Sequence, residues 1–127
     1  MPIERSVFDI LLGSAGQDLA VCRALVDNAT VSDAMFGFHA QQAVEKAIKA
    51  VLSANKIEFR RTHDLVTLPD LLDDNKLAPP PEAGRLDELN PYAVEARYGM
   101  LDFGGLDRAN ALRVAELVIE WASKAAS

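Results

Sequence analysis

Hydrophobic residues recur every three or four positions along the first half of the chain, which is the spacing of one face of an α-helix. Within residues 5–27 this stripe comprises Phe8, Leu11, Leu12, Ala15, Leu19, Cys22 and Val26. A second stripe, ending near Ala54, comprises Phe36, Ala40, Ala43, Val44, Ala47, Ile48 and Val51. The pattern predicts two long helices, the second capped by Thr30 with Asp33, and the short turn between them favours an antiparallel hairpin.

The middle of the chain predicts shorter helices interrupted by proline. We expect one helix to begin at Thr62, to be kinked or split at Pro69, and to place on its apolar side Leu65, Leu68, Leu71 and Leu72. Pro80 or Pro81 is expected to be the first residue of another short helix that ends near Leu89. The next two residues, Asn90 and Pro91, are expected to end regular structure there.

A final helix is expected after the Gly104–Gly105 pair. Trp121 lies beside its apolar stripe, which comprises Leu112, Ala115, Val118, Ile119 and Ala122. No alternating apolar and polar run of useful length predicts a strand. We therefore expect an all-α fold, an antiparallel up-and-down bundle of four to five helices that residues 1–127 form as a single domain.

Composition and charge narrow the function classes. The chain has 13 Lys and Arg against 19 Asp and Glu, a formal charge of −6. A broad nucleic-acid groove is therefore not expected, because non-specific affinity comes from neutralising phosphates, although a small basic cluster stays compatible with this balance. The single cysteine, Cys22, excludes an internal disulfide, fits a reducing compartment and lies in an apolar run typical of core packing.

Targeting signals are the next consideration. The N-terminal residues show no signal-peptide pattern, and no apolar run approaches the roughly 20 residues that span a bilayer. We therefore expect a cytoplasmic protein that does not contact a membrane.

Three polar segments are candidates for chemistry. In the second helix, Gln42, Glu45, Lys46 and Lys49 share a face at spacings of three and four, which could hold a polar ligand or be a solvated face with local ion pairs. His63 follows Thr62 at a predicted helix start, where it either orients a ligand or is structural.

The third segment, residues 90–99, contains Arg97 beside Tyr98. Arg97 could grip a phosphate or carboxylate and Tyr98 could stack on a base. In the alternative, both tyrosines, Tyr92 and Tyr98, anchor the segment while Arg97 pairs with an acid. The sequence has no Gly-rich phosphate loop or nucleotide-binding fingerprint, and two histidines with one cysteine argue against a closed zinc site. We expect no cofactor and no metal.

Together these segments resemble the HEPN family (higher eukaryote and prokaryote nucleotide-binding domains). The run His39-Ala-Gln-Gln-Ala-Val-Glu-Lys-Ala-Ile-Lys-Ala resembles the family's second-helix signature, Thr62-His63-Asp64-Leu65 the start of its third helix, and residues 92–98 the connector before its last helix. The resemblance implies a helical bundle that dimerises. It also implies a minimal nucleotidyltransferase as partner, often in a toxin–antitoxin pair.

Other members are metal-independent ribonucleases in which an arginine is followed, after four to six residues, by a histidine. This sequence departs from that pattern, because the window after Arg97 holds Asp102, Phe103 and Gly104. Gly99 also stands where the family often has proline. We therefore expect a nucleotide-binding and partner subunit without a complete catalytic motif, whose ligand or partner contacts are Gln42, Glu45, Lys46, His63, Arg97 and Tyr98.

Two alternatives stay open. One is a divergent ribonuclease acting as a dimer, with His63 as acid/base and Arg97 or Arg61 stabilising charge on the phosphate. The other is a purely structural dimeric bundle. In either case Met35 and Phe38 are candidates for the dimer face.

Overall fold

A computed structural model describes residues 6–59, 61–93 and 105–125. Its helices are α1 (Val7–Leu25), α2 (Asp33–Ala54), α3 (Thr67–Asp74), the 3-10 helix η1 (Ala83–Tyr92) and α4 (Arg108–Ser123). The described residues contain no strand, so the expected all-α bundle of four to five helices is confirmed. None of these helices combines the length and apolarity that crossing a bilayer requires.

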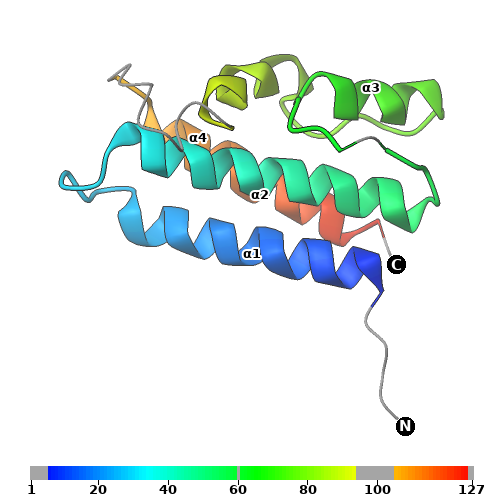
Figure 1. Ribbon diagram of the computed structural model, residues 1–127, viewed down its shortest axis with the longest axis horizontal. Coiled ribbons are helices and arrows are strands. Elements are labelled where there is room, and N and C mark those ends of the chain that lie inside the picture. The colour runs from blue at the N-terminus through cyan, green and yellow to red at the C-terminus, as the bar shows by residue number, and fades with distance from the viewer. Residues whose placement is uncertain (1–5, 60, 94–104, 126–127) are drawn as a thin grey trace, which may run out of the picture.

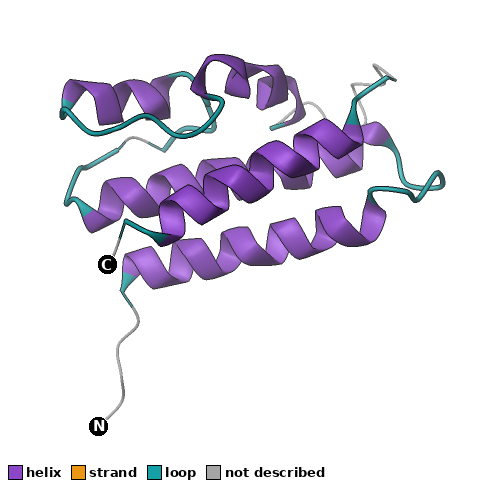
Figure 2. Cartoon of the chain, turned by 180° about the vertical axis from the view of Figure 1, so that it is seen from behind, coloured by secondary structure: helices purple, strands orange, loops and turns teal. Residues whose placement is uncertain are grey.

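Helix α2 is the centre of the bundle and packs against every other helix. It runs antiparallel to α1 on one side, while α3 and η1 form a layer on the opposite side (Figure 1). From behind, α4 lies across the back of α1 and α2 (Figure 2). None of the described helices covers the strip of α2 that faces the viewer in Figure 1.

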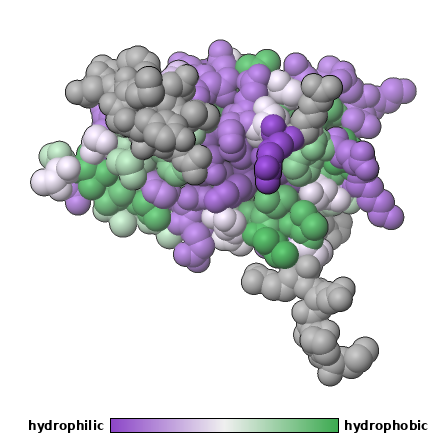
Figure 3. Space-filling model, in the orientation of Figure 1, coloured by the Kyte–Doolittle hydropathy of each residue, from purple (hydrophilic) through white to green (hydrophobic). Residues whose placement is uncertain are grey.

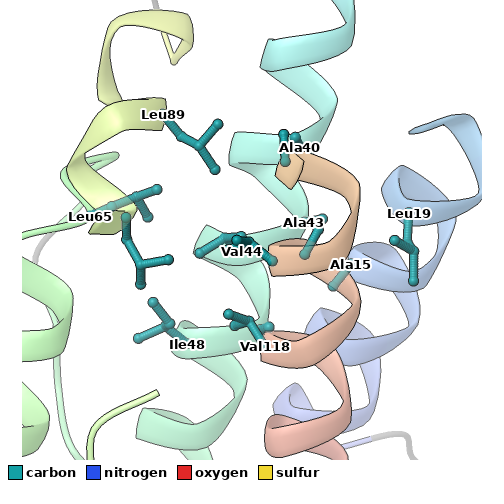
Figure 4. Close-up of a cluster of buried hydrophobic side chains, with 14 of the residues drawn as sticks. Ala15, Leu19, Ala40, Ala43, Val44, Ile48, Leu65, Leu89 and Val118 are labelled. Carbon is teal, nitrogen blue, oxygen red and sulfur yellow. The ribbon is translucent and has the colours of Figure 1, made fainter. Parts of the chain in front are cut away.

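The core consists mainly of small and aliphatic side chains, as the low aromatic content predicts. All seven residues of the predicted α2 stripe are buried, and α1 contributes Phe8, Ala15, Leu19 and Cys22. Figure 4 shows Leu19, Val44, Ile48, Leu65 and Val118 among these side chains. Burial raises the pKa of the Cys22 thiol to about 12, so this cysteine is a packing residue, as expected, and its thiolate is strongly disfavoured.

The helix starts differ in part from the sequence prediction. The N-cap of α2 is Ser32, whose hydroxyl accepts the Met35 N–H at 3.1 Å, and not Thr30. Thr30 instead donates its own hydroxyl to the Asn28 side chain within the turn. The prediction of a hydroxyl N-cap was correct, but its position was two residues too early. Ser32 has the extended backbone that an N-cap residue adopts.

The layer formed by α3 and η1 differs more from the sequence prediction than the long helices do. Helix α3 begins at Thr67, so Thr62 is not its N-cap, and Pro69 lies in the first turn. A proline there replaces an N–H that has no partner inside the helix, so it neither kinks nor splits α3.

The segment after α3 also departs from expectation. Regular structure begins at Ala83 and not at Pro80 or Pro81, because Glu82 has a left-handed backbone (φ 59°). It then continues as a 3-10 helix through Asn90 and Pro91, which were expected to end it.

Tyr92 fixes the end of η1 against α2. Its side chain is 6% exposed and lies against Gly37, where an added Cβ would come within 2.5 Å of the ring. Only glycine leaves room for this ring. The alternative in which the tyrosines anchor the connector is therefore confirmed for Tyr92.

Candidate functional site

The polar residues of α2 form two neighbouring groups, which reach from the helix toward different segments of the chain. The Glu45 cluster (Gln41, Glu45, Lys49 and His63) faces the α3 side, and the Asp18 cluster (Asp18, His39 and Lys46) faces α1. Figure 3 shows hydrophilic surface gathered over the middle of this face, with hydrophobic patches below it over α1. The two groups together are called the α2 polar strip.

Glu45 is the buried centre of its cluster, with its side chain 4% exposed. Its Oε1 lies 2.8 Å from His63 Nδ1 and accepts Gln41 Nε2 at 2.9 Å, while its Oε2 lies 3.1 Å from Lys49 Nζ. The interpretation of residues 42–49 as a solvated face is therefore wrong for Glu45. Burying a carboxylate is costly unless it is paired and hydrogen-bonded, and here three groups satisfy it.

His63 is placed by backbone and side-chain contacts together. Gln41 Nε2 donates to the His63 carbonyl at 3.0 Å, and the ring Nδ1 lies on Glu45. Among the described residues, the other ring nitrogen, Nε2, has no hydrogen-bond partner, and the side chain is 44% exposed. The ring is therefore held in one orientation with Nε2 as the nitrogen that can contact a ligand.

The loop that carries His63 is fixed by the residue after it. Asp64 accepts the Val66 N–H at 2.9 Å and the Thr67 hydroxyl at 2.8 Å, and Asn90 of η1 donates to it at 3.0 Å. These hydrogen bonds, led by the one from Val66, hold the pKa of Asp64 below its usual value. Asp64 is therefore a structural residue that joins the His63 loop to α3 and η1.

Lys49 and Gln42 lie around the Glu45 cluster. Lys49 is 13% exposed and its ammonium lies 5.6 Å from the centre of the Phe59 ring. Gln42 donates to Gln41 at 2.7 Å, so it also belongs to this network. Gln41 is fully buried and was not predicted as a site residue from the sequence. Its position next to Gln42 in the second-helix signature could have indicated its role.

The Asp18 cluster separates Lys46 from the other predicted site residues. Lys46 Nζ lies 2.7 Å from Asp18 Oδ2, and His39 Nδ1 lies 2.9 Å from Asp18 Oδ1. The structure thus brings Glu45, His63 and Gln42 together, and directs Lys46 to the α1 side. Arg97 and Tyr98, the remaining predicted residues, lie outside the described residues.

A third charged group lies at the N-terminal end of α2, where Arg108 joins α4 to α2 and to the end of α1. Arg108 Nε donates to Asp33 at 2.7 Å, Nη1 donates to the carbonyls of Leu25 and Asn28 at 3.0 Å, and Nη2 donates to that of Val31. The hydrogen bond from Arg108 holds the pKa of Asp33 below its usual value. Sequence reasoning did not single out this arginine, since nothing in the local pattern distinguishes it from a surface residue.

A cavity of about 470 Å³ lies between η1 and α4. Its lining combines apolar Leu89 and Val114 with polar Arg85, Glu88 and Asn110. None of the predicted site residues that the structure describes lines it. The described part of the chain contains no group of three or more His, Cys, Asp or Glu side chains that could hold a metal ion.

Comparison with known proteins gives one finding. A family model described as HEPN domain matches residues 8–125, which is nearly the whole chain. No curated protein and no solved structure matches.

Proposed function

Because this chain belongs to the HEPN family, we propose that it is a nucleotide-binding partner subunit that acts with a minimal nucleotidyltransferase, as in a toxin–antitoxin pair. It works as a homodimer in the cytoplasm and has no complete catalytic motif of its own. The observation that carries this proposal is the Glu45 cluster, in which a buried carboxylate orients a half-exposed histidine. A buried carboxylate that fixes the orientation of an exposed imidazole is typical of a binding site, where supporting residues hold the ligand-contacting groups in place.

The geometry suits a phosphate-bearing ligand. The Nε2 of His63 has no hydrogen-bond partner among the described residues and donates to a phosphate when the imidazole is protonated, and Lys49 keeps two ammonium hydrogens beyond the one that faces Glu45. The Glu45 carboxylate is only 4% exposed, so a phosphate approaching from outside meets the Lys49 ammonium and the imidazolium of His63 before it meets the carboxylate. Gln42 lies next to this group, and Lys46 lies on the α1 side of the same strip. Arg97 and Tyr98 belong to the proposed site on sequence grounds.

A second candidate, a divergent metal-independent ribonuclease, is favoured by one observation. A carboxylate that orients His Nδ1 and leaves Nε2 outward is the arrangement of a general acid/base. Arg61, two residues before His63, is the cation that could stabilise charge on the scissile phosphate. RNA cleavage by the purified chain that disappears in His63→Ala would establish this function in place of the first.

The test of the leading proposal begins with the tagged chain captured from its native host. The expected result is a nucleotidyltransferase that re-forms the complex when both proteins are purified and mixed. Titration calorimetry with ATP then compares the complex with one carrying Lys46→Glu and Arg97→Glu. We expect affinity to fall about a hundredfold, since two phosphate contacts become repulsive. Unchanged affinity in the double variant would remove the site assignment.

A further inference from the structure

Both histidines of the chain are held in the same way. The Nδ1 of His39 lies 2.9 Å from Asp18, and that of His63 lies 2.8 Å from Glu45. The second oxygen of each carboxylate holds a lysine, Lys46 on Asp18 and Lys49 on Glu45. The arrangement is thus repeated on the two sides of α2, although the carboxylates come from different helices.

The lysines of the strip are unusually fixed for surface cations. Lys46 and Lys49 are 25% and 13% exposed, whereas Lys124 on α4 is 73% exposed. A long side chain that is already held loses less conformational entropy when a ligand binds it. Desolvating these charges is costly for the fold, so an arrangement that serves stability alone would be more simply built from apolar residues.

The Asp18 cluster presents donors outward, as the Glu45 cluster does. Asp18 is 13% exposed, less than His39 at 24% or Lys46 at 25%. The Nε2 of His39 has no hydrogen-bond partner among the described residues. An anion approaching α2 from the α1 side therefore meets the Lys46 ammonium and, when the imidazole is protonated, the Nε2 N–H of His39.

The separation of the clusters sets the kind of ligand. His39 and Lys49 are ten residues apart on α2, which corresponds to about 15 Å at the rise of an α-helix. A single phosphate cannot contact both ends of such a strip. A ligand that uses both clusters must carry several phosphates along one chain.

We infer that Asp18, His39 and Lys46 form a second phosphate-contacting cluster, so that the α2 polar strip binds a chain of phosphates rather than one phosphate. His39 and Lys46 contact phosphate oxygens, and Asp18 is the positioning residue that orients both. This inference rests on the proposed function only in taking a phosphate-bearing ligand. The shared chemistry belongs to the backbone of single-stranded RNA and to a nucleoside triphosphate.

The test uses three probes on the full chain. Binding of a labelled single-stranded RNA of roughly eight nucleotides is measured by fluorescence anisotropy. Binding of ATP and of inorganic triphosphate is measured by calorimetry. His39→Asn keeps a donor for Asp18 in the place of Nδ1 and removes Nε2. Lys46→Met keeps the length of the side chain and removes its charge. Lys124→Met is the matched control, because it makes the same change in net charge on α4.

Both strip variants are expected to weaken binding about tenfold, against less than about twofold for the control. With RNA, each lost phosphate contact also lowers the salt slope by about 0.7. Binding of RNA alone identifies a nucleic-acid backbone, and binding of ATP and triphosphate identifies a nucleotide; either supports the inference. Thermal melting checks that the variants are folded.

Two outcomes overturn the inference: no probe binds the wild-type chain, or both strip variants bind like the control. The proposed function fails differently. If ATP affinity is lost with His63→Asn or Arg97→Glu and kept with His39→Asn and Lys46→Met, the second cluster is removed and Lys46 leaves the proposed site, while the nucleotide-binding function stands. If no nucleotidyltransferase joins the chain while RNA binding depends on the strip, only the partner assignment is removed.

Discussion

Arg108 on α4 is a largely enclosed charge and Glu45 on α2 a buried one, but their hydrogen bonds lead to different kinds of group. Each guanidinium nitrogen of Arg108 donates to a group of the chain itself: the Asp33 carboxylate and the carbonyls of Leu25, Asn28 and Val31. Glu45 contacts Gln41 and Lys49 within the fold, but its third partner is His63, whose side chain is 44% exposed. A charge satisfied entirely from within holds the fold together, whereas a charge that orients an exposed group prepares that group for a ligand.

The largest effect is expected at Arg108. Arg108→Ala removes the donor that Asp33 and three backbone carbonyls share at the junction of α1, α2 and α4. The Arg108 and Asp33 side chains are 16% and 23% exposed, so we expect a loss of about 3 kcal/mol, the lower end of the cost of removing one partner of a buried pair. Urea unfolding at neutral pH measures this change in the free energy of unfolding.

The matched control for this variant is Arg23→Ala. Arg23 pairs with Glu116 between α1 and α4, but the two side chains are 57% and 43% exposed. An exposed pair of this kind contributes about 0–1 kcal/mol. If the two arginine variants unfold at the same urea concentration, Arg108 does not stabilise the helix junction. It would then not be a fold-stabilising charge to compare with Glu45.

Glu45→Gln is expected to have a smaller but still clear effect. The amide keeps the size of the side chain and one acceptor for His63, but it turns an N–H toward Lys49, which needs an acceptor. An unsatisfied buried group costs about 1–3 kcal/mol. Unlike Arg108→Ala, this variant should also weaken ATP binding, because the neutral amide holds His63 and Lys49 less firmly than the carboxylate does. A loss of stability with unchanged affinity would make the Glu45 cluster structural as well.

Acid unfolding tests the pairing of Asp33 with Arg108. The pKa of Asp33 is lowered from 3.8, first by the hydrogen bond from Arg108, so Asp33 stabilises the fold fully above that value and progressively less as pH falls through its folded pKa. The stability difference between wild type and Arg108→Ala should therefore shrink below about pH 4. Urea midpoints measured between neutral pH and pH 3 test this, and a difference that stays constant contradicts the role given to the pair.

The long helices were predictable because their signal is repeated along many residues. All seven residues of the predicted α2 stripe are buried as expected, and α1 and α4 lie where the stripes place them. The α3–η1 layer was not predictable to the same degree. Its geometry depends on Asn90 reaching Asp64 and Leu65, and on Tyr92 lying against Gly37, which are contacts between residues far apart in the sequence.

The candidate site was likewise predictable only in part. Spacing placed Gln42, Glu45 and Lys46 on one helix face, but side-chain length and the neighbouring helices decide where each group points. Glu45 turns toward the His63 loop, while Lys46 turns toward Asp18 on α1. Asp18 lies on a helix that offered no polar pattern of its own, so its role could not be inferred before α1 and α2 were placed side by side.

His63→Asn is expected to have the smallest effect on stability and a large one on binding. The asparagine amide can still donate to Glu45 in place of Nδ1, and the ring it replaces is 44% exposed, so the free energy of unfolding should change by less than about 0.5 kcal/mol. ATP affinity should fall about tenfold, because Nε2 is lost. Calorimetry and urea unfolding on the same preparation give both numbers. The opposite result is a destabilised protein that binds ATP as before. It would mean that His63, like Arg108, only stabilises the fold. The Asp18 cluster would then be the part of the α2 polar strip that contacts a ligand.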